Sequence, residues 1–324
     1  MRRKTKTIAA RKASKPKPWT PGSQADGIIN FRLTSWSHFF DFLEAEVFQP
    51  SSSSRQCYIW RGQRRADWSL SSSLDRLFGE MKLLAASPSE LERRLARHLD
   101  VFKHAARGRR GPNPASLPEE KDWWALGQHF GLATPLLDWT RSPFAAAYFA
   151  FEELASDPTD YRVVYGLSRE AVDKKNEEIS TAWNAEKVRT LERERITEEL
   201  VRKAAKRKKE SPTTKNARNE GTHIVANERV PKIEFIDPMS DENQRLVSQG
   251  GLFTRAPIGT PIERWVSQAF EGSESAVLLQ IEVPDHDRQQ CLRALDRMNI
   301  NHLSLFPDLS GASRWTNLTL ELES

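Results

Sequence analysis

The sequence is poor in cysteine and contains no long apolar run, and both shortages narrow the class of protein. Its 324 residues include only two cysteines, Cys57 and Cys291, too few for a disulfide scaffold or a zinc site built on thiolates. The longest nearly apolar stretch, residues 143–151, is far shorter than the ~20 residues that a helix needs to span a bilayer. No apolar segment follows the basic N-terminus, so we expect no secretory signal. These absences predict a cytoplasmic protein without membrane contact.

Several signatures of catalysis are missing as well. Neither GxGxxG nor GxxxxGK[S/T] occurs, which argues against a Rossmann or P-loop nucleotide site. Neither GxSxG nor HExxH occurs, and the seven histidines are dispersed. Hydrolysis by a nucleophilic serine or by a bound metal therefore has little support, and we expect no metal site. A nuclease would need clustered acidic metal ligands, which we do not find.

Positive charge is concentrated in two segments. Residues 1–19 hold eight Lys and Arg and no acidic residue, and residues 201–215 hold seven against the single Glu210. The whole chain carries a formal net charge of +5, so the remainder is net acidic. Such segments attract polyanions by releasing counterions, which predicts a nucleic-acid partner, RNA more than DNA. The alternative is a solvated tail and a solvated helix face.

The order of the expected elements favours an α+β fold. We expect a basic disordered tail over residues 1–25 and one domain over residues 26–324. A charged helical insertion at about 170–222 interrupts this domain. Expected strands at 57–63, 161–167 and 276–283 interleave with expected helices at 36–47, 89–107 and 142–154, the second capped by Ser89. This order lacks the strict βαβ rhythm of a doubly wound parallel sheet.

Residues 60–63 (WRGQ) form the first candidate site. Arg61 ends an apolar strand and precedes Gly62, which would let backbone approach a ligand closely. An arginine suits phosphate because its planar fork binds two oxygens at once. The alternative is an arginine that pairs with an internal aspartate.

Residues 127–143 form the second candidate site. Asp138, Thr140 and Ser142 stand just before an apolar helix with Pro143 at its first position. Such residues can cap the helix, and the same helix start can bind phosphate, so both readings stay open. His129 is a candidate base or ligand contact, or else a structural histidine.

Residues 243–254 form the third candidate site. Gln249 could hydrogen-bond a ribose, and the following Gly250 and Gly251 permit a positive φ or a close backbone approach. A helix C-cap explains the glycines equally well.

At these motifs the sequence resembles the FRG domain family, named for a Phe-Arg-Gly motif that reads WRGQ here. The second block matches residues 128–143 and 148–150, the third residues 243–245 and 249–254, and the last residues 304–309 with Gly311. The four blocks stand in the family's order across about residues 30–315. Two positions depart from the family's pattern: Pro135 stands where an arginine is frequent, and Ala133 where a proline is frequent.

The resemblance implies an α+β fold with a split mixed β-sheet, distantly related to ADP-ribosyltransferases and found in bacterial anti-phage and toxin settings. Such proteins bind NAD, here as substrate, in a cleft. Arg61 matches the arginine or histidine that holds a ribose or phosphate, and Thr140 and Ser142 resemble the second motif. The third motif is usually a glutamate; Gln249 lies in the matching block, and Glu234 is a spare candidate.

The expected function is therefore NAD-dependent ADP-ribosyl transfer to a nucleic acid, RNA favoured, by a toxin or effector of anti-phage defence. An inhibitor or antitoxin protein is a candidate partner. The alternative is a non-catalytic nucleotide or nucleic-acid binding module. We expect the pyrophosphate at Arg61 and at the helix start, and the nicotinamide stacked on Trp139 or Tyr148. The catalytic candidates are Arg61, Thr140 and Gln249, and the NAD-binding candidates are Trp60, Arg61, Gly62, Gln63, His129, Asp138, Trp139, Thr140, Ser142 and Tyr148.

Overall fold

The computed structural model describes residues 17–48, 58–111, 114, 116–154, 158–207, 230–237 and 248–323. The strands within these ranges are β1 (Trp19–Ala25), β2 (Ile28–Leu33), β3 (Tyr58–Gln63), β4 (Leu136–Thr140), β5 (Tyr161–Ser168), β6 (Glu234–Ile236), β7 (Gly251–Arg255) and β8 (Leu278–Pro284). The helices are α1 (Phe39–Phe42), α2 (Ser73–Glu80), α3 (Pro88–Ala105), α4 (Glu120–His129), α5 (Pro143–Phe151), α6 (Arg169–Arg207), α8 (Ile262–Ala269), α9 (Arg288–Arg297), α10 (His302–Leu305) and α11 (Leu309–Glu323).

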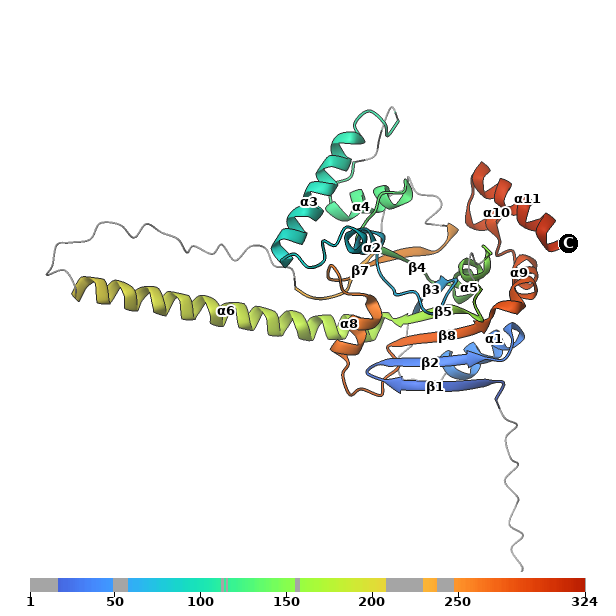
Figure 1. Ribbon diagram of the computed structural model, residues 1–324, viewed down its shortest axis with the longest axis horizontal. Coiled ribbons are helices and arrows are strands. Elements are labelled where there is room, and N and C mark those ends of the chain that lie inside the picture. Colours follow the sequence, from blue (N-terminus) through green and yellow to red (C-terminus); the bar gives the residue numbers. More distant parts are fainter. Residues whose placement is uncertain are drawn as a thin grey trace, which may run out of the picture.

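The eight strands form one mixed sheet in the order β1-β2-β8-β5-β3-β4-β7-β6 (Figure 1). β2 pairs with β8 in parallel, and the other neighbouring strands pair antiparallel. The α+β class and the mixed sheet expected from the sequence are therefore confirmed.

The sheet is buried on both faces, because successive side chains of its central strands alternate between two apolar clusters. Trp60 and Val164 pack with α5 on one face. Ile59 and Val163 pack with α8 on the other. A third cluster joins α2, α3 and α4 to β4 and β7. Strand β3 thus lies in the middle of the core, which fixes the direction of each of its side chains.

The N-terminal hairpin corrects one expectation. Disorder was predicted through residue 25, but residues 19–25 form β1, which pairs with β2. Asp26 and Gly27 both have positive φ angles, 51° and 80°, as a two-residue hairpin turn requires. Trp19 is buried and packs edge-on against Phe42. The prediction weighed composition and overlooked the Asp-Gly turn; residues 1–16 lie outside the described residues.

The caps of two helices follow local chemistry. Ser142 accepts a hydrogen bond from the Ala145 N–H and Pro143 is the first helical residue, so α5 begins as expected. Helix α3 is capped by Ser87 rather than by the expected Ser89. The helix starts two residues earlier because Pro88 is also suited to a first helical position.

Two buried arginines hold the other end of α5. Arg162 donates to the carbonyl oxygens of Ala150 and Glu153, at 2.7 and 2.8 Å. Arg288 donates to those of Phe151 and Glu152, at 2.8 and 3.0 Å. The last carbonyls of a helix have no partner within it, so these two side chains satisfy them and fix where α5 ends.

Helix α6 (Arg169–Arg207) lies within the range where a charged helix was expected, and Figure 1 shows it projecting from the body. Its first turns are anchored by buried Val172 and by Asn176, which exchanges two hydrogen bonds with the backbone of Ile233. Residues 184–203 are all exposed. The rest of the expected insertion lies outside the described residues. No helix in the described ranges is both long and apolar enough to cross a membrane.

Candidate functional site

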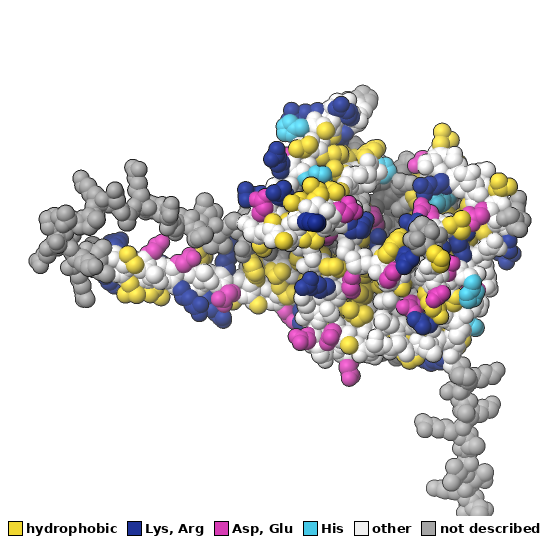
Figure 2. Space-filling model, viewed as in Figure 1, with side chains coloured by type: hydrophobic (Ala, Val, Ile, Leu, Met, Phe, Trp, Pro, Cys, Tyr) yellow, Lys and Arg dark blue, Asp and Glu magenta, His cyan; other side chains and the backbone are white. Residues whose placement is uncertain are grey.

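The central cavity opens where β3 and β4 part. β3 pairs with β4 only at Trp60 and Thr140, whereas it pairs with β5 along its whole length. Beyond that point the Arg61 side chain bridges the two strands, because its Nη1 donates to the carbonyl oxygen of Asp138 at 2.9 Å. Figure 2 shows the hollow between the part that carries α3 and α4 and the part formed by α10 and α11. Its volume is about 980 Å³, at the upper end for ligand sites.

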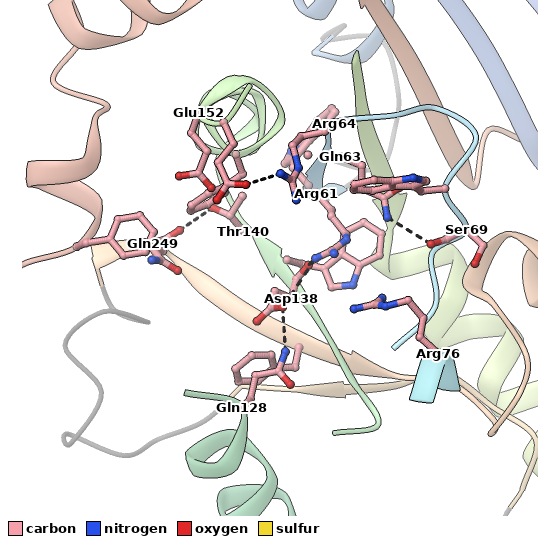
Figure 3. A pocket seen from close by; sticks show the side chains of 18 of the residues that line it. Arg61, Gln63, Arg64, Ser69, Arg76, Gln128, Asp138, Thr140, Glu152 and Gln249 are labelled. Atoms are coloured by element: carbon pink, nitrogen blue, oxygen red, sulfur yellow. Dashed lines mark hydrogen bonds and ion pairs between the residues drawn. The ribbon is translucent and has the colours of Figure 1, made fainter. Parts of the chain in front are cut away.

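The lining of the cavity mixes aromatic residues with many charged side chains (Figure 3). It includes four arginines, Arg61, Arg64, Arg76 and Arg314. It also includes four carboxylates, Asp67, Asp138, Glu152 and Glu153. Positive and negative side chains therefore line the same cavity. The arginines can hold an anionic ligand, and the carboxylates can face its reacting groups.

Arg61 is the most constrained of these arginines. Its side chain is 20% exposed, and Nη1 lies 3.8 Å from Asp138 Oδ2. Burial lowers the pKa of Arg61, the Asp138 carboxylate counteracts this, and nearby Arg76 lowers the pKa further. The guanidinium stays charged at any physiological pH. Its Nε is buried and has no hydrogen-bond partner among the described residues, a deficit that it shares with a few other side-chain atoms and that calls for an explanation.

Ion pairs cross one side of the cavity. Glu153, just beyond α5, pairs with Arg64, and its Oε1 lies 3.7 Å from Nη1 of Arg314 on α11. Arg64 also lies over the ring of Trp68, 5.3 Å from its centroid. These contacts link the segment after β3 to α5 and to α11. A ligand anion would compete with Glu153 for two arginines at once.

Polar residues of α4 orient the Asp138 carboxylate. Gln128 Nε2 donates to Asp138 Oδ2 at 2.9 Å, and the Thr134 hydroxyl donates to the other end of the same amide. His129 follows Gln128 and also lines the cavity. The structure therefore brings His129 and Asp138 to one site, as predicted from the sequence.

Thr140 and Gln249 meet at the cavity, but Ser142 does not line it. The Thr140 hydroxyl donates to the Gln249 carbonyl at 2.6 Å and accepts from the Ser142 N–H. The Gln249 amide donates to the carbonyl of Leu305 at 3.2 Å. Ser142 serves α5 as its cap, and the cavity instead receives residues near the C-terminal end of that helix. The start of α5, where a phosphate was expected, therefore does not border this cavity.

The aromatic candidates have structural roles. Trp60 and Trp139 belong to the core, and the Trp139 indole N–H donates to Thr254 Oγ1 at 2.8 Å. Tyr148 is buried behind the cavity and does not line it. Trp60 and Trp139 border the cavity but are only 2% and 3% exposed, whereas Tyr148 does not reach it. The exposed aromatic residue at the cavity is Trp68, 42% exposed, which was not among the predicted contacts.

Gly62 is needed for packing rather than for ligand approach. An ideal Cβ on this residue would lie 1.9 Å from the carbonyl oxygen of Ala146 and 2.6 Å from the backbone nitrogen of Ala150. Strand β3 and helix α5 therefore touch backbone to backbone at this point. Gln63, the last residue of the motif, is buried and donates to the carbonyl of Ser69 at 3.3 Å.

The carboxylate that the sequence did not reveal is Glu152. It lines the cavity just past the end of α5. Glu234, the spare candidate, lies on β6 opposite Arg255 and borders a different groove. The signal for Glu152 was its position two residues after the second motif, near the end of the expected apolar helix.

Two further predictions have no structural test here. Residues 243–245 of the third motif lie outside the described residues. Within the described ranges no group of three or more His, Cys, Asp or Glu side chains is arranged to hold a metal ion.

Together the fold and the cavity define an α+β domain with a ligand-sized polar site in the fork of a mixed sheet. The family model described as FRG domain matches residues 56–160, the stretch that carries β3, α2, α3, α4, β4 and α5. The chain therefore contains an FRG domain, as the motifs predicted. No curated protein and no solved structure matches the chain.

Proposed function

We propose that the cavity binds NAD and that the protein transfers its ADP-ribosyl group to an acceptor. The observation that carries the proposal is the pair Arg61 and Arg76, which line one cavity and whose like charges disfavour each other. An anion between two such cations relieves their repulsion, and a pyrophosphate offers the oxygens that arginine forks bind. The buried, unpartnered Nε of Arg61 is consistent with a site completed by a ligand.

The carboxylates supply the second half of the proposal. In ADP-ribosyl transfer the bond from C1′ of the ribose to the nicotinamide nitrogen breaks, nicotinamide takes the electron pair, and an acceptor oxygen or nitrogen bonds to C1′ and loses its proton. Positive charge develops on the sugar, and a fixed carboxylate in a partly water-excluded cavity stabilises it. Glu152 is the carboxylate that we assign to this role, because its side chain lines the cavity and is only 15% exposed.

We extend the proposal to a nucleic-acid acceptor, RNA favoured, and to a toxin or effector in anti-phage defence. Support for the acceptor comes from the basic segments at residues 1–19 and 201–215. An inhibitor protein would then restrain the free toxin. In cells, we expect expression of the wild-type protein to arrest growth and expression of Arg61→Ala to leave growth unchanged.

Arg61→Ala is expected to weaken NAD binding by roughly 10- to 100-fold, because a hydrogen-bonded charge contact is worth about 1.5–3 kcal/mol. Arg61→Lys keeps the charge but loses the fork and is expected to recover only part of this. Arg32→Ala is the matched control, since Arg32 forms an exposed ion pair with Glu282 on β8. The measurement is titration with NAD, followed by transfer from labelled NAD to RNA, DNA and protein in parallel.

Wild-type affinity for NAD in Arg61→Ala would overturn the assignment of the site. NAD binding without transfer to any acceptor and without release of nicotinamide would favour the alternative, a non-catalytic binding module.

A further inference from the structure

A chain of three polar side chains runs from the cavity wall into the apolar core. The Tyr148 hydroxyl lies 2.5 Å from Nδ1 of His302, and Nε2 of the same imidazole lies 3.3 Å from Oε2 of Glu152. Tyr148 and His302 are both buried, while Glu152 reaches the cavity. Tyr148 and Glu152 stand four residues apart around the end of α5, and His302 is the first residue of α10.

The apolar surroundings of Tyr148 and His302 make it costly in free energy to bury these polar side chains. Tyr148 belongs to the apolar cluster on the α5 face of the sheet. The imidazole stacks on Phe306, with ring centroids 4.6 Å apart and planes at 12°. Polar groups in such a place cost free energy unless each finds a partner, and an apolar pair would fill the same space without that requirement.

The protonation of the chain follows from its geometry. Burial, together with the Glu152 carboxylate, raises the pKa of Tyr148 above its ordinary value, so the phenol keeps its proton at neutral pH. The phenol can therefore donate to Nδ1 of His302, and we take it as the donor in the relay. In that arrangement a neutral imidazole carries its proton on Nε2, which lies 3.3 Å from Glu152 Oε2.

The backbone of Glu152 is held by separate hydrogen bonds. Arg288 donates to the Glu152 carbonyl at 3.0 Å, and Arg162 donates to the carbonyl of Glu153 at 2.8 Å. The main chain at Glu152 is thereby fixed, and one oxygen of its carboxylate lies 3.3 Å from the His302 imidazole. Such double restraint is typical of a side chain whose position matters to a reaction.

We propose that Tyr148 and His302 are positioning residues that orient the Glu152 carboxylate toward the cavity and hold it in its ionised form. This inference rests on the proposed function for the reaction that the carboxylate serves. The relay itself, the Tyr148–His302 hydrogen bond and the 3.3 Å contact between His302 Nε2 and Glu152 Oε2, is a property of the folded protein and is measurable without turnover.

Tyr148→Phe removes one hydroxyl and keeps the shape of the side chain. With NAD and the acceptor that the parallel transfer assay identifies, kcat is expected to fall about tenfold or more while KM for NAD changes less than about twofold. His302→Gln is expected to have the same effect. Tyr58→Phe is the control, because it removes a phenol hydrogen bond of 2.9 Å to the Ala276 carbonyl on another part of the sheet. A role in stability alone would lower the melting temperature of Tyr148→Phe and Tyr58→Phe alike and leave kcat unchanged, which would overturn the proposal.

Nitrogen NMR of the full chain with labelled histidine gives the second readout. The His302 signal is identified by its loss in His302→Gln. We expect the neutral Nε2–H tautomer in the wild type and a mixture of tautomers in Tyr148→Phe. An Nδ1–H tautomer in the wild type overturns the relay whatever the activity. If the wild type transfers nothing but shows the expected tautomer and its change in Tyr148→Phe, the transferase proposal fails and the relay stands.

Discussion

Gly62→Ala is expected to destabilise the protein by about 3 kcal/mol or more, because its new methyl group would overlap the backbone of α5. An ideal Cβ there lies 1.9 Å from the carbonyl oxygen of Ala146, and neither strand nor helix backbone can move aside as a side chain could. The strand must shift away from α5 and take Arg61 and Gln63 with it. Chemical denaturation followed by tryptophan fluorescence measures the loss, and NAD titration of the folded fraction measures the effect on the cavity.

Gly79→Ala provides the control for that experiment. Gly79 is exposed on α2, and an added Cβ would meet only the Leu84 side chain at 3.8 Å, an ordinary contact. Alanine in a helix is favoured over glycine by roughly 1 kcal/mol, so this variant should be slightly stabilised. Equal stability of Gly62→Ala and the wild type would show that β3 and α5 lie farther apart than described here.

Arg162→Met is expected to cost about 3–5 kcal/mol, because it breaks a buried ion pair and leaves the end of α5 without its partners. Arg162 is 1% exposed, and its Nε donates to Asp285 at 2.5 Å while Nη1 donates to the carbonyls of Ala150 in α5 and of Glu153 just after it. Methionine nearly matches the volume but supplies no donor. Thermal unfolding and denaturant titration measure the difference in the free energy of unfolding.

The comparison variant is Arg32→Met. Arg32 pairs with Glu282 at 2.8 Å and is 55% exposed, so its loss should change stability by less than about 1 kcal/mol. Arg162→Lys keeps the charge but cannot bridge three acceptors, so it should fall between methionine and the wild type. Equal losses for Arg32→Met and Arg162→Met would contradict the role given to burial.

The parts of the site that could be predicted from sequence are those written in short motifs. The local sequence around a glycine or a helix start identifies such positions, as it does for Arg61, Asp138 and Thr140. All three line one cavity in the structure. What each motif residue does was harder to predict. Gly62 reads equally as a ligand approach or as a helix contact, and only the position of α5 decides between them.

Contacts between distant segments could not be predicted, because periodicity and capping carry no information about them. Tyr148 and His302 are 154 residues apart in the chain, and Arg288 and Phe151 are 137 apart. The relay and the restraint of Glu152 therefore appear only in the folded protein. Helix α11 was not among the expected helices, although it follows Asp308, whose carboxylate accepts a hydrogen bond from the Gly311 N–H.

The parallel pairing of β2 with β8 has a consequence for synthesis of the chain. Ile28 pairs with Leu278 and Arg32 with Glu282, so partners lie 250 residues apart. At ~5–20 residues per second, the N-terminal hairpin leaves the ribosome roughly 10–50 s before its partner strand exists. Throughout that interval one edge of β2 has open backbone donors and acceptors. The nascent chain is thereby exposed to misassociation through this strand until nearly the whole sequence has been made.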